Sequence, residues 1–225
     1  MEAFSQEKTP KTIPEYGTGF EELKAENTLL KEQLKNRDEQ IKHLEAQLEK
    51  QRDYFEKKIG IDSLTGANSR FSFERELVRS LKIIRGEITE RRANLESLKE
   101  ISLIFIDLDN FKQVNDSFGH QEGDKVLKET AQLMKSSLRE TDMLARYGGD
   151  EFVALLLNTN QEQAMAAANK LRVGIENDIK LKELKVTASF SVISSEISTD
   201  ADTLYKLADE ALYKAKRNGK NCVEI

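Results

Sequence analysis

The stretch ISLIFIDLDNFK occupies residues 101–112 and decides which fold the chain can adopt. Its first part is apolar and rich in β-favouring residues, which predicts a buried strand over residues 101–107. Two carboxylates, Asp107 and Asp109, close the strand, and a helix is predicted from residue 111. Alternate strand residues share a face, so we expect both carboxylates on one face of the strand or at its rim. The stretch therefore predicts an acidic site where a buried strand passes into a helix.

The sequence on either side alternates between helix-like and strand-like segments. Helices are expected over about residues 70–98, from 111 to about 139 in two parts, over 161–177 and over 201–217; further strands are expected on both sides of 148–151, over 185–193 and at the C-terminus. Helices alternating with strands on a mixed sheet predict a domain of the α/β or α+β class. We expect this globular domain to span residues 61–225.

A second acidic stretch, RYGGDEF, occupies residues 146–152. Gly148 and Gly149 lie between two strand-like runs, which indicates a hairpin. Asp150 and Glu151 follow the glycines, and a glycine pair allows a bulky ligand to approach the backbone. On composition alone, an ordinary turn and an acidic binding site both remain open.

The first acidic stretch has the chemistry of a magnesium and phosphate site. Free N–H groups of Asn110, Phe111 and Lys112 at the start of the helix would form a phosphate cradle. Mg²⁺ prefers carboxylates, water and substrate phosphates to a closed protein cage. We therefore interpret Asp107 as a metal ligand, whereas for Asp109 we favour the alternative of a helix cap.

The N-terminal quarter of the chain has a different pattern. Residues 1–18 contain both prolines and predict a flexible tail, with a short recognition peptide as an equal alternative. Over residues 19–60 a heptad repeat follows, with Phe20, Asn27, Leu34, Ile41, Leu48 and Phe55 at position a and Leu23, Leu30 and Leu44 at position d. This repeat predicts a coiled coil, and the asparagine at position a favours a parallel homodimer. The alternative is a single solvated helix.

The composition excludes several classes of protein. A net charge of −5 argues against a nucleic-acid binder that neutralises many phosphates. No apolar run approaches the ~20 residues that span a bilayer, and the N-terminus has no signal-peptide core. The single cysteine excludes a disulfide within the chain. These features predict a soluble, cytoplasmic protein with no membrane segment and no nucleic-acid partner.

The RYGGDEF stretch resembles the signature of the GGDEF family of diguanylate cyclases. Three further motifs match that family in order: DSLTG at 62–66, FIDLDNFKQVNDSFGHQEGD at 105–124, and ADEALYKAK at 208–216 followed by NGKN at 218–221. The resemblance implies a ferredoxin-like domain akin to nucleotidyl cyclases and polymerase palms, in a bacterial cytoplasm. It also implies the condensation of two GTP molecules into cyclic di-GMP on Mg²⁺ or Mn²⁺, with release of pyrophosphate.

The resemblance assigns roles to individual residues. It places the metal at Asp107, the backbone carbonyl of Leu108, Asp150 and Glu151; of the last two, we favour Asp150 for removing the 3′-hydroxyl proton and Glu151 as the direct ligand. Lys112 would stabilise charge at the reacting phosphates. The residues implied in GTP binding are Asn110, Phe111, Lys112, Asn115, His120, Asp124, Gly149, Lys216 and Lys220. Within this set, Asn115 and Asp124 match the guanine-reading positions and the last two lysines match the β- and γ-phosphate contacts, while His120 has packing as an equal alternative.

Arg139 and Asp142 resemble the family's RxxD site, at which the product cyclic di-GMP binds as an inhibitor. A salt bridge at a helix end is the simpler alternative. Three positions depart from the family pattern: Ser69 and Ser191 replace an asparagine and a glycine, and Lys220 replaces an arginine that would bind phosphate with two donors.

Since cyclic di-GMP is two-fold symmetric, two domains must meet, each with half of the site. The coiled coil would raise the effective concentration of one domain near the other. The runner-up hypothesis is a catalytically silent domain that senses GTP or cyclic di-GMP, which the intact acidic residues disfavour. A cyclase making cyclic GMP-AMP is disfavoured by Asp124. No sensor domain is recognisable, so the tail, the coil or an unidentified input protein would carry the activating signal.

Overall fold

The computed structural model of the protein describes residues 17–88 and 98–225. Residues 1–16 of the predicted tail lie outside the described residues, and Gly17 and Thr18 already belong to the first helix, α1 (Gly17–Ile59). The chain divides after Gln51 into two compact units, of which the second contains the globular domain.

Helix α1 carries an apolar stripe that is largely exposed to solvent. The side chains at the predicted heptad positions Leu34, Ile41 and Leu48 are 60%, 52% and 65% exposed. Exposed leucines and isoleucines repeated along one helix gain little stability until another apolar surface covers them. The long helix is thus confirmed, while its pairing into a parallel dimer stays a prediction.

The second unit is a six-stranded mixed sheet flanked by helices. Its elements are β1 (Asn68–Ser69), α2 (Arg70–Ile84), β2 (Ile101–Asp109), α3 (Phe111–Phe118), α4 (His120–Ser137), β3 (Met143–Gly148), β4 (Glu151–Leu157), α5 (Gln161–Asn177), α6 (Ile179–Glu183), β5 (Thr187–Ser194), α7 (Ala201–Arg217) and β6 (Val223–Glu224). The strand order is β1-β3-β4-β2-β5-β6. Strand β2 pairs antiparallel with β4 and β5, and β3 pairs antiparallel with β4. The central β-α-β-β-α-β unit, from β2 to β5, has the ferredoxin-like topology, which confirms the predicted fold class.

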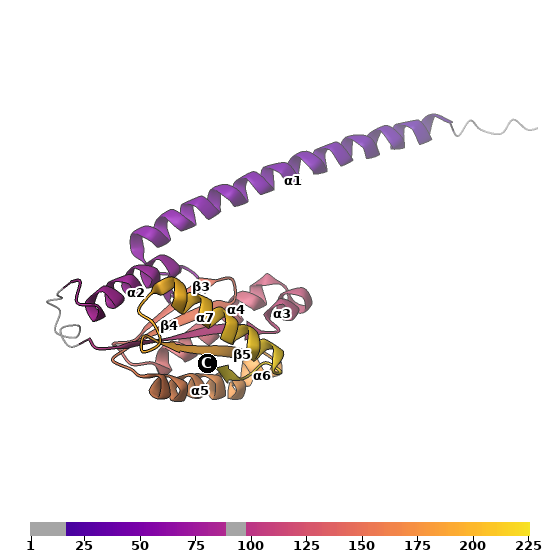
Figure 1. Ribbon diagram of the computed structural model, residues 1–225. Coiled ribbons are helices and arrows are strands. Elements are labelled where there is room, and N and C mark those ends of the chain that lie inside the picture. The colour runs from indigo at the N-terminus through magenta and orange to yellow at the C-terminus, as the bar shows by residue number, and fades with distance from the viewer. Residues whose placement is uncertain (1–16, 89–97) are drawn as a thin grey trace, which may run out of the picture. The chain divides into compact units, whose positions relative to one another are not determined.

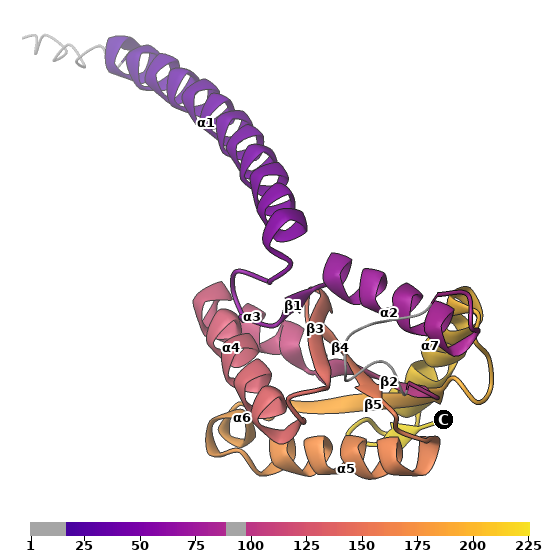
Figure 2. The same cartoon turned by 90° about the vertical axis from the view of Figure 1, so that its left-hand side faces the viewer.

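Two layers of helices cover the sheet. Helices α2 and α7 lie on one face, and α5 lies on the opposite face together with α4 (Figures 1 and 2). Strand β2 supplies side chains to both cores: Ile104 and Ile106 point toward α4 and α5, whereas Leu103 and Phe105 point toward α2 and α7. This alternation is the two-residue period of a strand buried on both faces.

The helix expected over residues 70–98 ends at Ile84, so the prediction is wrong for residues 85–88. Arg85 forms the C-cap and Gly86 follows with a φ of 72°, a left-handed conformation that ends helices. Residues 89–97 of that prediction lie outside the described residues. Ser69, one of the departures from the family pattern, starts α2 as its N-cap by accepting a hydrogen bond from the Ser72 amide. Among the described residues, none of the helices combines the length and apolar character needed to cross a membrane.

Candidate active site

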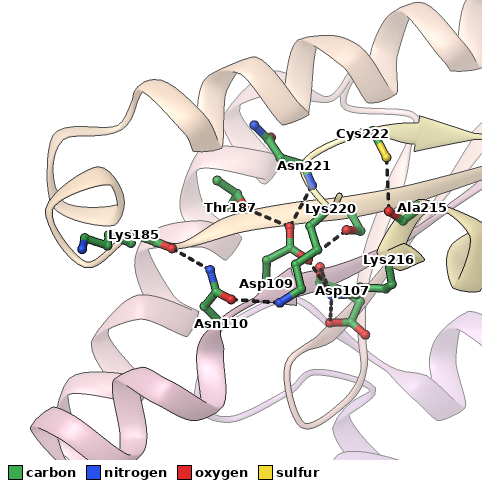
Figure 3. A network of polar contacts seen from close by, with 11 residues as sticks. Asp107, Asp109, Asn110, Lys185, Thr187, Ala215, Lys216, Lys220, Asn221 and Cys222 are labelled. Carbon is green, nitrogen blue, oxygen red and sulfur yellow. Dashed lines mark hydrogen bonds and ion pairs between the residues drawn. The ribbon is translucent and has the colours of Figure 1, made fainter. Parts of the chain in front are cut away.

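The acidic residues lie at one end of the sheet, on the face that α7 covers. Asp107 of β2 is directly opposite Glu151 of β4 on one side and Ser189 of β5 on the other. Asp107 and Asp109 continue the face of Leu103 and Phe105, so both carboxylates point toward α7, where one lysine, Lys216, binds them (Figure 3). The prediction that the two share a face is confirmed.

Lys216 is the main cation in contact with these carboxylates. Its Nζ lies 2.8 Å from Asp107 Oδ1, 2.7 Å from Asp109 Oδ1 and 3.3 Å from the Asp107 carbonyl oxygen. The residue belongs to the last turn of α7, so packing of that helix on the sheet places the ammonium group over the strand end. Lys216 therefore contacts the predicted metal ligand directly.

Asp109 does not cap the following helix, so that prediction is wrong. The N-cap of α3 is Asn110, which has a left-handed φ of 64° and makes no capping bond with its side chain. Asp109 still belongs to the strand, because it pairs with Thr187 of β5, and its carboxylate points across the sheet instead of toward the helix amides. It is fully buried.

The two aspartates differ electrostatically. Burial raises the pKa of Asp107, and the negative charges of Asp150 and Asp109 add to burial and outweigh the lowering effect of Lys216. Burial also opposes ionisation of Asp109, but hydrogen bonds from Lys216, Thr187 and Ser189 hold its pKa below the ordinary value. The partners of Asp109 thus stabilise its negative charge fully, whereas those of Asp107 offset its charge only in part.

Glu151 also has a raised pKa, because of burial and of other carboxylates close to it. Burial raises its pKa first, and the charges of Asp107, Asp150 and Asp209 raise it further. In residues 17–88 and 98–225, no three acidic, histidine or cysteine side chains are grouped closely enough to hold a metal ion by themselves. Mg²⁺ binds through one or two protein carboxylates and takes its remaining ligands from water and substrate phosphates. Asp107 and Glu151, which are opposite each other on β2 and β4, and Asp150 beside Glu151 are the carboxylates that could contribute protein ligands to such a shell.

The signature stretch forms the predicted hairpin between β3 and β4. The pairing register shifts between Arg146 and Gly148, which marks a bulge or irregularity in the hairpin. A Cβ at Gly148 would lie 3.2 Å from Glu151 Oε2, so the glycine leaves room for this carboxylate. The backbone N–H of Leu108 donates to the Asp150 carbonyl at 3.3 Å, and this bond ties the hairpin to β2.

Arg146 is a site residue for which the sequence pattern predicts no role. Its Nε and Nη2 donate to the Gly149 carbonyl at 3.0 and 2.7 Å, and its Nη1 lies 3.3 Å from Asp62 Oδ2. The side chains of Arg146 and Asp62 are only 10% and 4% exposed. Burial alone would raise the pKa of Asp62, but hydrogen bonds from Thr65 and the charge of Arg146 lower it. This buried pair connects the DSLTG turn with the hairpin. Asp62 and Arg146 each belong to a family motif, but they are 84 positions apart, so the sequence does not show that they are in contact.

The predicted guanine-reading residues lie on the two helices that follow β2. Gly119, with a φ of 83°, joins α3 to α4, so that the helices pack against each other. A Cβ at Gly123 of α4 would overlap the side-chain oxygen of Asn115 and lie 3.2 Å from Phe111 Cζ. Asn115 thus packs directly over Gly123, beside Asp124. The side chains of Lys112, His120 and Asp124 are exposed, so His120 is not a core residue.

Lys220 lies in a strained turn after α7. Gly219, Lys220 and Asn221 all have positive φ values, of 105°, 64° and 47°. Lys220 Nζ donates to Asn110 Oδ1 at 2.9 Å, while Asn110 Nδ2 donates to the Lys185 carbonyl at 3.1 Å (Figure 3). The structure therefore brings Asp107, Asn110, Lys216 and Lys220 together at the end of β2.

Arg139 and Asp142 form a closed turn between α4 and β3. Asp142 Oδ2 accepts from the Arg139 backbone N–H at 3.0 Å, and the Asp142 N–H donates to the Arg139 carbonyl at 3.0 Å. These bonds use the backbone of Arg139, and the residue itself is exposed. Asp142 Oδ1 is buried and forms no hydrogen bond of good geometry; burial raises the pKa of this carboxyl, and the weaker opposing effects come from the backbone N–H groups of Arg139 and Leu157 and from the charge of Arg139. Both residues line two pockets of about 360 and 390 Å³.

Comparison with known proteins gives concordant results. The family described as "Diguanylate cyclase, GGDEF domain" matches residues 59–222. Diguanylate cyclase A of Treponema denticola is 40% identical over 134 residues, which are 58% of this chain and 36% of the relative. Diguanylate cyclase DgcS of Shewanella oneidensis is 33% identical over 164 residues, or 73% of this chain and 52% of the relative. The chain thus spans about a third to a half of the length of these relatives.

Two solved structures extend the likeness to the N-terminal helix. The coiled coil and GGDEF domain of DgcB from Caulobacter crescentus, in complex with c-di-GMP, has a TM-score of 0.61 at 25% identity and covers 87% of this chain and 98% of that one. The diguanylate cyclase SiaD from Pseudomonas aeruginosa, in complex with its activator SiaC, has a TM-score of 0.59 at 30% identity and covers 91% and 79%.

Proposed function

The chain belongs to the GGDEF family of diguanylate cyclases, and from this membership we propose that it condenses two GTP molecules into cyclic di-GMP and releases pyrophosphate. The observation that carries the proposal is the negative charge of Asp107, Asp150 and Glu151 at the end of β2 and the start of β4, which the nearby Lys216 offsets only in part. Asp107 and Glu151 are neighbours across the sheet, and the charge of Asp150 raises the pKa of both. Such a concentration of negative charge favours a divalent cation and its phosphate ligands.

In the proposed reaction, the 3′-oxygen of one GTP attacks the α-phosphorus of another. A new O–P bond forms, the bond from the α-phosphorus to the bridging oxygen of the β-phosphate breaks, and Asp150 accepts the 3′-hydroxyl proton. The 3′-oxygen of the second nucleotide then attacks the α-phosphorus of the first in the same way, so that the ring closes and two pyrophosphate molecules leave. Mg²⁺ or Mn²⁺, held by Asp107, Glu151 and the Leu108 carbonyl, would polarise the reacting phosphate when bound. Lys112 and the first amides of α3 would stabilise the charge that develops on phosphate oxygens.

Nucleotide binding would use the surface around that centre. Asn115 and Asp124, on the packed pair α3 and α4, can face the guanine edge, whose N1 and N2 donors a carboxylate accepts together. Lys216 and Lys220 would bind the β- and γ-phosphates. Asn110, Phe111, His120 and Gly149 would complete the site around the phosphates and ribose.

Each chain would provide one half of the active site, and α1 would bring two chains together. The exposed apolar stripe of α1 and the likeness to a structure that contains a coiled coil support a parallel dimer. We expect Ile41→Asp to reduce the rate at low protein concentration and a high concentration to restore it, whereas Lys42→Asp, on the outer face, should do neither. A monomeric Ile41→Asp chain with full activity at low concentration would refute this role.

The product would inhibit the enzyme at Arg139 and Asp142. An exposed arginine and a largely buried carboxylate in one turn suit the acceptor and donor edges of guanine. Relatives with bound c-di-GMP, such as DgcB, show that domains of this fold bind this nucleotide.

The deciding experiment is incubation of the full chain with GTP and Mg²⁺, after removal of bound nucleotide, with chromatographic separation of the products. We expect cyclic di-GMP from the unmodified chain and from Glu183→Gln, a change at an exposed glutamate on α6, but at least a hundredfold less from Asp150→Asn and Glu151→Gln. No cyclic di-GMP at high protein concentration, with GTP nevertheless bound, would indicate a silent sensor. Equal activity of Asp150→Asn would overturn the assignment of the site.

A further inference from the structure

The buried carboxylate of Asp109 has four hydrogen-bond donors. Oδ1 accepts from Ser189 Oγ at 2.8 Å and from Lys216 Nζ at 2.7 Å. Oδ2 accepts from Thr187 Oγ1 at 2.8 Å and from the Asn221 backbone N–H at 3.1 Å (Figure 3). An ionised carboxylate has about four acceptor sites, so this one is saturated. Its exposed fraction is zero.

Saturation separates Asp109 from the neighbouring Asp107. The Asp107 side chain is 25% exposed and has Lys216 as its ion-pair partner, so it can take a cation with little rearrangement. A cation at Asp109 would have to displace donors that come from strand β5, from helix α7 and from the turn after α7. We propose that Asp109 is a positioning residue for the triphosphate-binding lysines and not a metal ligand.

Asp109 acts on Lys216 directly. Because the ammonium group is shared between two carboxylates, neither one holds it alone. With Asp109 present, Lys216 stays over the strand end while Asp107 remains accessible. Without the charge of Asp109, Lys216 would lose the buried one of its two carboxylate partners, and its ammonium group would be held less firmly over the strand end.

Asp109 acts on Lys220 through Asn221. The bond from the Asn221 N–H fixes one side of the left-handed turn at residues 219–221. The Asn221 side chain fixes the other side, with Nδ2 at 2.9 Å from Glu176 Oε1 and Oδ1 at 3.3 Å from Arg172 Nη1 of α5. Lys220 immediately precedes Asn221 in the chain, so the position of its ammonium group at Asn110 depends on these bonds of Asn221.

The inference rests on the proposed function, since it assumes that Lys216 and Lys220 bind the β- and γ-phosphates. The decisive variant is Asp109→Asn, which keeps the shape of the side chain but removes its charge. It also replaces one acceptor oxygen by an NH₂ group, which cannot accept hydrogen bonds from the donors around it. We expect it to reduce affinity for a non-hydrolysable GTP analogue about tenfold, by loss of charge-assisted bonds that hold the lysines, and to leave affinity for GMP unchanged.

The experiment measures calorimetric binding of the GTP analogue and of GMP, together with the Mg²⁺ concentration for half-maximal rate at saturating GTP. Asp107→Asn should raise the Mg²⁺ requirement, and Asp109→Asn should leave it unchanged. If Asp109→Asn fails to fold, Thr187→Val removes one donor without a change of charge and should weaken analogue binding about threefold, with GMP binding unaffected. Thermal melting and circular dichroism report folding of each variant.

An increased Mg²⁺ requirement with unchanged analogue affinity in Asp109→Asn would make Asp109 a ligand and overturn the inference. Equal losses for the analogue and for GMP in the folded variant would also overturn it, because they would show a general disturbance of the site. If the unmodified chain bound neither nucleotide, the proposed function would fail as well. If it bound both but the variant kept the normal preference for the triphosphate, only the inference would fail.

Discussion

Replacement of Arg146 by alanine tests whether the pair of Arg146 and Asp62 holds the hairpin in place. Both side chains are buried, and the guanidinium forms two bonds to the Gly149 carbonyl and one ion pair. Removal of one partner of a buried pair leaves a buried charge without compensation, which costs about 3–5 kcal/mol. We therefore expect Arg146→Ala to lose that much free energy of unfolding in urea titrations. Arg146→Lys keeps the charge but not the planar fork, so we expect it to lose less.

The loss of Arg146 should also lower the rate of the reaction. The Gly149 carbonyl would lose both Arg146 donors, and Asp150 and Glu151 follow it directly in the chain. We expect the cyclase rate of Arg146→Ala to fall at least tenfold at temperatures where the domain is still folded. Lys180→Ala, which breaks the exposed pair of Lys180 and Glu129, is the matched control and should change neither quantity measurably.

A double variant gives the sharpest test of this reasoning. If the cost of Arg146→Ala comes from the stranded Asp62 charge, then Asp62→Asn introduced into that variant should restore part of the lost stability. If the double variant is instead as unstable as the sum of the two single changes, the two side chains do not interact. A free energy of unfolding within 1 kcal/mol of the unmodified chain for Arg146→Ala would refute the argument outright.

Three further predictions concern separate parts of the domain. The pKa of Asp62 is lowered in the folded chain, so its ionised form stabilises the fold above its ordinary pKa of about 3.9, and this contribution is lost as pH falls through the folded pKa. The difference in unfolding free energy between the unmodified chain and Asp62→Asn should therefore shrink from pH 6 to pH 3. Gly123→Ala should displace the Asn115 side chain, raise the KM for GTP as much as Asn115→Ala does, and have no further effect when added to Asn115→Ala, so a further increase would contradict the packing argument. Arg139→Ala should keep the initial rate and abolish the slowing of progress curves as product accumulates, whereas unchanged slowing would exclude product binding at this turn.

Much of the domain could be predicted because its signals are local. Helices α5 and α7 have the predicted bounds of 161–177 and 201–217, and the hairpin lies at the two adjacent glycines. The first helix of the domain was overextended because residues 85–98 contain helix-favouring side chains, and Gly86, which ends the helix locally, is a weaker signal than that run. The short helix α6 was not predicted, since five residues are too few for a clear periodicity.

The sequence by itself determined the class of the fold, the group of acidic residues and the family, because strand period, glycine turns and motif order are written along the chain. Only the tertiary structure decided which partners each charge has. Asp107 and Asp109 look equivalent in the pattern Asp-Leu-Asp, yet the register of β2 with β5 and the packing of α7 saturate one of them and leave the charge of the other offset only in part. Arg146 and Asp62 meet across 84 residues for the same reason. Hydrogen-bond saturation and burial depend on neighbours in space, and no local pattern records these.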